Sequence, residues 1–86
     1  MPRIAEFYGI VIAMYHNDHE PAHFHAAYAG QRAVIGMDPA RVLDGTLPPR
    51  ALRMVMAWAT AHHLELRDNW RRARAGQPLA RIAPLD

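Results

Sequence analysis

A pair of prolines, Pro48 and Pro49, divides the sequence into two halves with different periodicities. Short β-favouring stretches separated by turn residues fill the first half, and apolar residues at helical steps of three and four fill most of the second. Proline is tolerated in the first turn of a helix, where its missing N–H would have no partner, so the pair indicates a helix start. A run of strands followed by helix predicts an α+β fold with an antiparallel sheet.

The first half predicts a three- or four-stranded antiparallel β-meander. Residues 6–15 are apolar on both faces and are predicted to form one central strand. A second strand at 23–28 and a third at 32–37 are separated by residues 29–31, a length that suits a hairpin turn. Residues 41–43 are expected to add a short edge strand.

In the second half one helical phase runs to about Ala75, followed by Gly76 and Pro78 as a stop signal. We expect a long C-terminal helix that covers the sheet, or a helix that breaks near His62 and His63. The segment after it is predicted to be a last strand or an extended tail.

The sequence predicts specific positions for three residues of the helical half. His63 and Trp70 share the apolar stripe and are predicted to pack in the core. The alternative is that they reach toward the sheet, where His63 could join the histidines of the turn. Trp58 lies off that stripe, which leaves three interpretations open: a contact with the C-terminal tail, a dimer contact, or a scattered exposed aromatic.

The chain has 86 residues, enough for one small domain (residues 1–86) with a single core. It has no cysteine, so disulfides, thiolate metal sites and cysteine nucleophiles are excluded, and a reducing cytoplasm is the expected compartment. Any metal would be held by nitrogen and oxygen. The longest apolar stretch, residues 7–15, is too short to cross a bilayer, so no membrane association is expected. A homodimer is compatible with so small a core.

Residues 16–25 contain four of the six histidines and two carboxylates. His23 and His25 are two apart on a predicted strand, so both point to one face, near enough to share one metal ion or one phosphate. Asp18 and His19 lie in the preceding turn. If the turn folds back over the strand, the four residues form a three-nitrogen, one-oxygen set suited to zinc, nickel, manganese or iron.

Three interpretations of this histidine group stay open. The first is one divalent metal ion. The second is metal-free acid–base catalysis of the ribonuclease type, in which a neutral histidine takes a proton from a hydroxyl and a protonated one donates to the leaving group. In the third, the side chains only hydrogen-bond one another and the turn backbone, and their role is structural.

All ten basic residues are arginine, and the formal net charge is +2. Guanidinium groups suit bidentate contacts to phosphate or carboxylate, although a high-GC genome would give the same composition. A basic ridge that binds nucleic acid or an acidic partner is predicted along one flank of the helical stripe, where solvated helix faces have a similar pattern. Its members are Arg53, Arg67, Arg71 and Arg74.

Further residues extend the pattern around the histidines. They are Met1-Pro2-Arg3-Ile4, Gly9-Ile10, Met14-Tyr15, Asp18-His19, Pro21, His23-Phe24-His25-Ala26, Gly45, Leu47-Pro48, Glu65-Leu66 and Asn69-Trp70. Over nearly the whole chain this pattern resembles the small bacterial and archaeal family called domain of unknown function 4160. The resemblance implies a stand-alone protein encoded beside another small domain of unknown function, an arrangement suspected to be a toxin–antitoxin pair. It implies no established activity. Ala22 departs from the pattern, because the family often has a second proline there.

We therefore predict a cytoplasmic component of a toxin–antitoxin-like module that acts on or binds RNA and has a small cognate partner protein. His23 and His25 are the predicted acid/base or ligand pair, Asp18 would orient His19, and the arginine ridge would hold the RNA backbone. The alternative is a non-enzymatic protein-interaction module, or a small metal-binding protein, whose histidines are structural.

Overall fold

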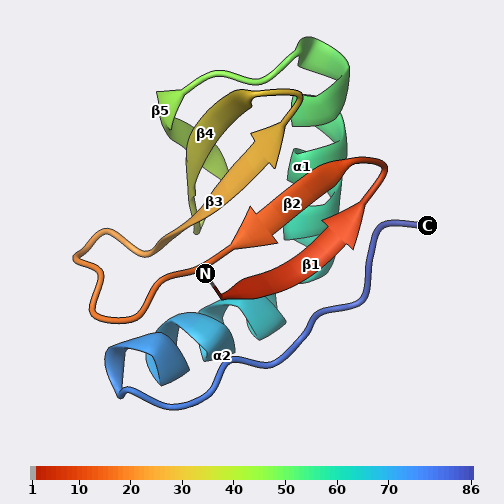
Figure 1. Cartoon of the computed structure of the whole chain (residues 1–86). Coiled ribbons are helices and arrows are strands. Elements are labelled where there is room, and N and C mark those ends of the chain that lie inside the picture. Colours follow the sequence, from red (N-terminus) through yellow and green to blue (C-terminus); the bar gives the residue numbers. More distant parts are fainter. Residues whose placement is uncertain (1) are drawn as a thin grey trace.

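The computed structural model describes residues 2–86 and contains five strands followed by two helices (Figure 1). Met1, which belongs to the sequence pattern above, lies outside the described residues. The elements are β1 (Arg3–Phe7), β2 (Ile10–Ala13), β3 (His23–Tyr28), β4 (Gln31–Gly36), β5 (Arg41–Gly45), α1 (Pro49–Ala61) and α2 (His63–Arg74). The strands form one antiparallel sheet in the order β1-β2-β3-β4-β5. The predicted α+β meander with C-terminal helices is confirmed.

The prediction of one central strand over residues 6–15 is wrong, because the chain reverses at Tyr8 and Gly9. These residues have φ angles of 51° and 79°, and two successive positive φ values are what a type I′ hairpin turn requires. Tyrosine is not a usual residue for this turn, so the apolar pattern gives no sign of it. The reversal pairs Phe7 with Ile10 and makes the sheet five-stranded instead of three- or four-stranded.

The helical half is broken where the sequence suggested. α1 ends at Ala61, His62 has the non-helical angles φ −116° and ψ 26°, and α2 begins at His63. Because the helical phase is interrupted at His62, the apolar stripe does not continue through His63. The prediction that His63 is a core residue is therefore wrong, since its side chain is exposed, whereas Trp70 is buried as predicted.

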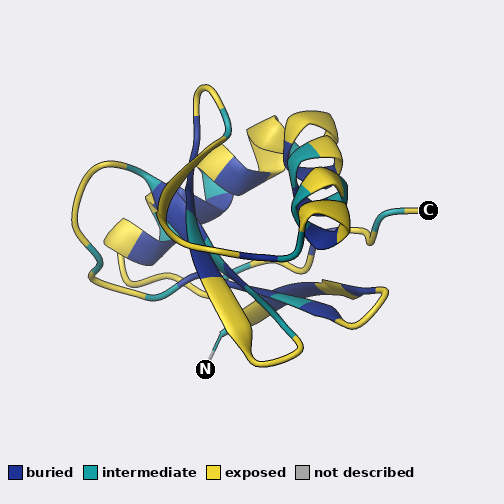
Figure 2. Cartoon of the chain, turned by 90° about the horizontal axis from the view of Figure 1, so that it is seen from above, coloured by how far each residue is buried: buried dark blue, intermediate teal, exposed yellow. Residues whose placement is uncertain are grey.

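The core lies between the two helices and one face of the sheet (Figure 2). Trp58 is at its centre, fully buried, with its ring centroid 5.4 Å from that of Phe7 and 5.8 Å from that of Phe24. Its indole N–H donates to the carbonyl of Ala83 at 2.8 Å. Contact with the C-terminal tail, one of the three expectations for Trp58, is thus confirmed. The other face of the sheet has no helix over it.

The residues after α2 form an extended tail, which is fastened at two further points. The side-chain amide of Asn69 donates to the Ala80 carbonyl and accepts from the Ala80 N–H, at 2.8 and 2.9 Å. The N–H of Ile82 donates to the carbonyl of Ile4 at 2.8 Å. The tail therefore runs along β1 at one edge of the sheet, while every residue of β5 at the other edge is exposed.

Gly45 at the end of β5 is a position where alanine is expected to be costly. Its φ is +76°, and a Cβ atom there would overlap the backbone carbonyl oxygen of Arg32. Gly45→Ala is expected to lower the free energy of unfolding by about 1–3 kcal/mol, because the strain of a positive φ and the overlap add. Urea denaturation measures the change.

Gly30 provides the matched control for this substitution. Its φ is +80°, but a Cβ atom there would have no neighbour within 4 Å. Gly30→Ala should therefore lower the free energy of unfolding only through backbone strain, and by less than Gly45→Ala does. Equal losses for the two variants would contradict a specific close approach between β5 and the backbone at Arg32.

Candidate metal centre

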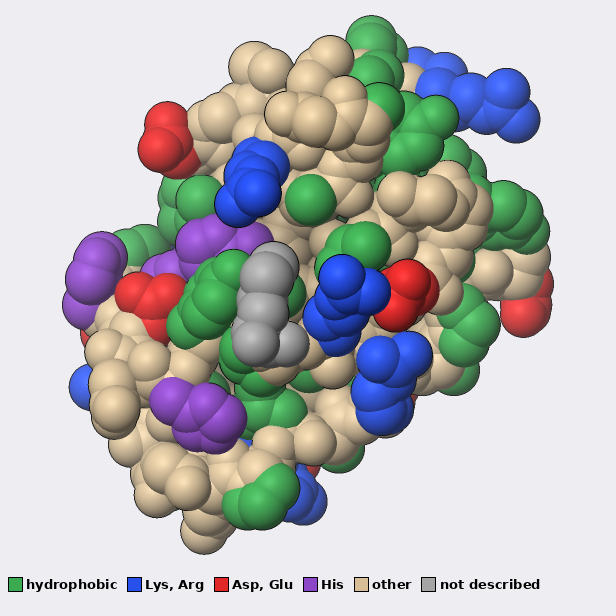
Figure 3. Space-filling model, viewed as in Figure 1, with side chains coloured by type: hydrophobic (Ala, Val, Ile, Leu, Met, Phe, Trp, Pro, Cys, Tyr) green, Lys and Arg blue, Asp and Glu red, His purple; other side chains and the backbone are tan. Residues whose placement is uncertain are grey.

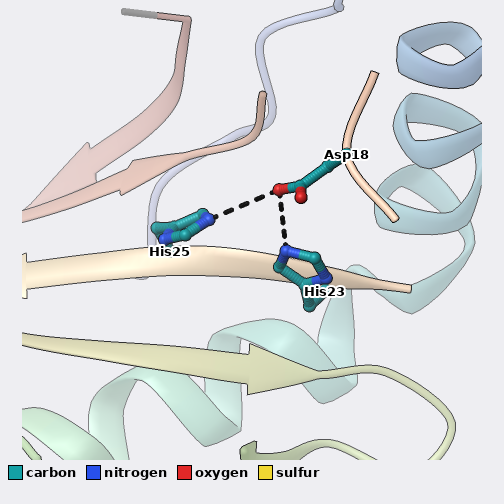
Figure 4. A group of neighbouring side chains, drawn as sticks. All are labelled: Asp18, His23 and His25. Atoms are coloured by element: carbon teal, nitrogen blue, oxygen red, sulfur yellow. Dashed lines mark hydrogen bonds and ion pairs between the residues drawn. The ribbon is translucent and has the colours of Figure 1, made fainter. Parts of the chain in front are cut away.

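The loop between β2 and β3 folds back over the start of β3 and brings a carboxylate to two histidines (Figure 4). Strand alternation places His23 and His25 on the same side of β3, away from the core residue Phe24. Oδ2 of Asp18 lies 2.8 Å from Nε2 of His23 and 3.7 Å from Nε2 of His25. The turn before β3 therefore does fold back over the strand, and it brings Asp18 to the two histidines.

Both ring nitrogens of His23 face oxygen acceptors. Nδ1 is 2.7 Å from the carbonyl oxygen of Pro21, and Nε2 faces the carboxylate of Asp18. A neutral imidazole carries only one N–H. When Nδ1–H donates to the carbonyl, as is common in metal-binding histidines, the Nε2 lone pair points at the carboxylate. The arrangement is then stable only with a second proton or a metal cation between Nε2 and Oδ2.

His25 has a ring nitrogen that nothing satisfies. Its Nε2 is buried and has no hydrogen-bond partner within residues 2–86, and 3.7 Å to Asp18 is too long for a hydrogen bond. Burial lowers the pKa of His25, and the charge of His23 lowers it further, against an opposing effect of Asp18. A neutral ring with a free nitrogen aimed at a carboxylate is suited to bind a cation.

Asp18 is held in its ionised form. Burial acts to raise the pKa of Asp18, but hydrogen bonds from the backbone N–H of His19 and from the ring of His23, together with the charge of His23, outweigh it and leave the pKa below its ordinary value. The other carboxylate oxygen, Oδ1, is the one that accepts the His19 N–H, at 3.1 Å. Oδ2 is therefore the oxygen directed at the two imidazoles.

The three side chains fit one small divalent ion. One donor atom from each of Asp18, His23 and His25 lies within 4.8 Å of the others. Donors bound to the same tetrahedral ion at about 2.0–2.1 Å are roughly 3.3 Å apart. The separations of 2.8 and 3.7 Å from Oδ2 lie on either side of that spacing, and the two imidazole nitrogens are no more than 4.8 Å apart.

The remaining histidines of the loop have other contacts. Nδ1 of His19 lies 3.1 Å from the carbonyl oxygen of Glu20, and its ring centroid is 6.1 Å from that of His23. Asp18 therefore orients His23, and only the backbone of His19 contacts it. Nε2 of His16 lies 2.9 Å from the carbonyl oxygen of Gln77. The predicted four-residue set is thus reduced to Asp18, His23 and His25.

Helix α2 supports the loop from the other side, which the sequence did not indicate. The ring of Trp70 lies 5.2 Å from that of His23, measured between centroids. Arg74 stacks over Trp70 at 5.9 Å and pairs with Glu20 at 3.0 Å. An exposed ion pair contributes little, so we assign the support mainly to Trp70.

The predicted arginine ridge is spread over two helices and is largely neutralised. Arg53 lies on α1, whereas the other three lie on α2. Each of those three has a carboxylate partner: Arg67 with Asp38, Arg71 with Asp68, and Arg74 with Glu20. Figure 3 shows histidine and acidic side chains gathered together on one face, with arginines around them. Binding of RNA by the ridge stays a prediction.

A protein-family model described as "Domain of unknown function (DUF4160)" matches residues 9–71 of the 86-residue chain. The matched range includes Trp70 and the three residues of the candidate metal centre. Searches of curated proteins and of solved structures gave no match. Neither helix of the described chain has the length and hydropathy needed to span a membrane. The family description names no activity, so function has to be argued from the site.

Proposed function

This chain belongs to the domain of unknown function 4160 family, and we propose that it binds one divalent transition-metal ion through Asp18, His23 and His25. The observation that carries the proposal is the buried, unpartnered Nε2 of His25, directed at a carboxylate oxygen that already contacts His23. Two imidazoles and one carboxylate are a set found at catalytic zinc sites and at non-haem iron sites.

Three protein ligands would leave at least one coordination position for water. The side chains of His25 and Asp18 are 35% and 21% exposed, so the site lies near the surface, although the donor nitrogen of His25 is itself buried. Zinc bound in this way lowers the pKa of its water to about 7 and makes it a nucleophile near neutral pH. Hydrolytic chemistry is therefore the reaction class we propose.

The metal-free acid–base pair has less support. Both nitrogens of His23 are engaged by Pro21 and Asp18, and its side chain is only 7% exposed. A proton donor has to lie within hydrogen-bond reach of the leaving group. His23 is better placed to bind an ion inside the fold than to protonate a substrate outside it.

For the wider role we propose a cytoplasmic toxin–antitoxin-like module that acts on RNA, with a small partner protein. The support is the sequence pattern, the absence of cysteine and the arginine-only basic composition. Growth inhibition on expression of the chain, relieved by a neighbouring small protein, would support this role. The metal site is tested independently of it.

The test of the metal site is a calorimetric titration of the metal-free protein, purified without a histidine tag, with Zn²⁺, Mn²⁺, Ni²⁺ and Co²⁺. We expect one ion per chain for at least one of these metals. His25→Ala should weaken that binding at least about tenfold, because loss of a ligand should cost no less than the 10–100-fold typical of losing a residue that only supports one.

His19→Ala is the matched control, because it removes an imidazole from the same loop that is not directed at the ion. It should bind the metal like the wild type. If His19→Ala and His25→Ala weaken metal binding equally, the three-residue site is contradicted. If none of the four metals binds to the wild type, the proposal is overturned.

A further inference from the structure

A hollow of about 200 Å³ is lined by residues of β2 to β5, including His25 of the candidate metal centre. Its side chains belong to the sheet face that carries no helix. His25 belongs to both, since it contributes to the metal centre and also lines the hollow. Tyr15, Arg32 and Asp44 supply the other hydrogen-bonding side chains of its wall. A ligand in the hollow would therefore contact one of the imidazoles of the candidate metal centre.

The hollow exists because short side chains occupy its floor. Ala13, Ala27 and Gly45 all line it, although alanine and glycine are depleted in strands because they pack little surface. In the register of the sheet Ala27 lies opposite Arg32, and His25 lies opposite Val34. Arg32 is thus the diagonal neighbour of His25, about 7–8 Å away along the sheet, with only a methyl group beside it.

Arg32 is available for a ligand. No carboxylate of the described chain lies within ion-pair distance of its guanidinium, and its side chain is exposed. Asp44 also lines the hollow, but its Oδ1 accepts the N–H of Gly45 at 2.9 Å.

We propose that this hollow binds a single phosphate group, between the Arg32 guanidinium and the metal ion held by Asp18, His23 and His25. The metal contact rests on the proposed function, whereas the Arg32 contact does not. The guanidinium fork matches two phosphate oxygens, and a divalent ion takes a third. The volume of the hollow is below that of pockets for whole drug-sized ligands, which favours a single small group.

The phosphate can be that of a small phosphomonoester or a phosphodiester of RNA. The test therefore uses three probes, inorganic phosphate, a 5′-mononucleotide and a six-nucleotide single-stranded RNA, each titrated into zinc-loaded and metal-free protein and followed by amide chemical shifts. We expect Arg32→Ala to weaken phosphate binding about tenfold or more, as for loss of a charge-assisted hydrogen bond, with unchanged zinc affinity.

Arg50→Ala is the control, since it removes the same charge from an exposed site on α1 that belongs neither to the hollow nor to the arginine ridge. It should leave phosphate and zinc affinity unchanged. Equal phosphate affinity in wild type and Arg32→Ala, or an equal loss in Arg50→Ala, overturns the phosphate site, while stoichiometric zinc binding leaves the metal centre standing. If zinc fails to bind but phosphate binding still requires Arg32, the hollow is supported and the metal centre fails.

The probes also separate the two sources of the phosphate. RNA binding that requires Arg32 and exceeds the affinity for the mononucleotide assigns the hollow to a phosphodiester. Binding of phosphate and mononucleotide with no additional affinity for RNA assigns it to a small phosphorylated ligand. Absence of binding by all three probes in the zinc-loaded protein overturns the proposal.

Discussion

Replacement of Trp58 by alanine is expected to lower the free energy of unfolding by about 3–5 kcal/mol. The indole is fully buried among the rings of Phe7, Phe24 and His62, so its removal leaves a large cavity at the centre of the core. The carbonyl of Ala83 also loses its donor. Because small domains have only about 5–15 kcal/mol of stability, a measurable unfolded population is expected, and urea denaturation followed by circular dichroism would measure it.

Trp58→Phe separates packing from hydrogen bonding in this prediction. Phenylalanine keeps most of the buried ring but has no N–H, so the loss should be closer to the 1–3 kcal/mol of an unsatisfied buried acceptor. If Trp58→Ala and Trp58→Phe were equally destabilised, the effect would come from the bond to Ala83 and not from the core. A loss below about 1 kcal/mol for Trp58→Ala would contradict its complete burial.

Asp18→Asn is expected to remove metal binding, with a loss of affinity of about 100-fold or more, above the range seen when residues that only support a ligand are replaced. The carboxylate is the group to which both imidazoles are directed, and an amide carries no charge to offset that of the ion. Wild type at a free zinc concentration 100 times Kd should gain about 2.7 kcal/mol of stability. The variant should show no zinc-dependent rise in Tm.

Glu20→Gln tests whether any carboxylate of this loop has the same effect. Glu20 is exposed and pairs with Arg74, so its replacement should leave the zinc-dependent rise in Tm intact. A rise that survives in Asp18→Asn, or disappears in Glu20→Gln, would show that the metal binds elsewhere on the loop. Denaturation without zinc shows whether either variant has lost stability by itself.

Much of the fold could be predicted because its signals are local. The β3–β4 hairpin follows from a turn at Ala29 and Gly30, and α1 begins at the second residue of the proline pair. The β1–β2 reversal could not be predicted, since its one turn-favouring residue, Gly9, lies inside a continuous apolar run. The burial of Trp58 stayed one of three interpretations, because the tail that covers it has no helical or strand periodicity to indicate its path.

In the candidate site, too, the features set by local sequence could be predicted, and those set by distant contacts could not. His23 and His25 share a side because strand alternation is a local rule. The path of the loop depends on Trp70 and on the residues after α2, which lie more than forty residues along the chain, so the separation of Asp18 and His19 into different roles could not be read from their spacing. Arg32 could have been found, because the register of a two-residue hairpin places it opposite Ala27.

The tail after α2 links elements that are distant in sequence, with hydrogen bonds between Asn69 and Ala80, between Ile82 and Ile4, and between Trp58 and Ala83. A terminal segment usually frays without disturbing the rest of a domain. Here detachment would free one edge of the sheet and uncover the central indole at once, so fraying and global opening become one cooperative event. The amides of β1 and of this segment should then exchange with solvent deuterium through the same opening.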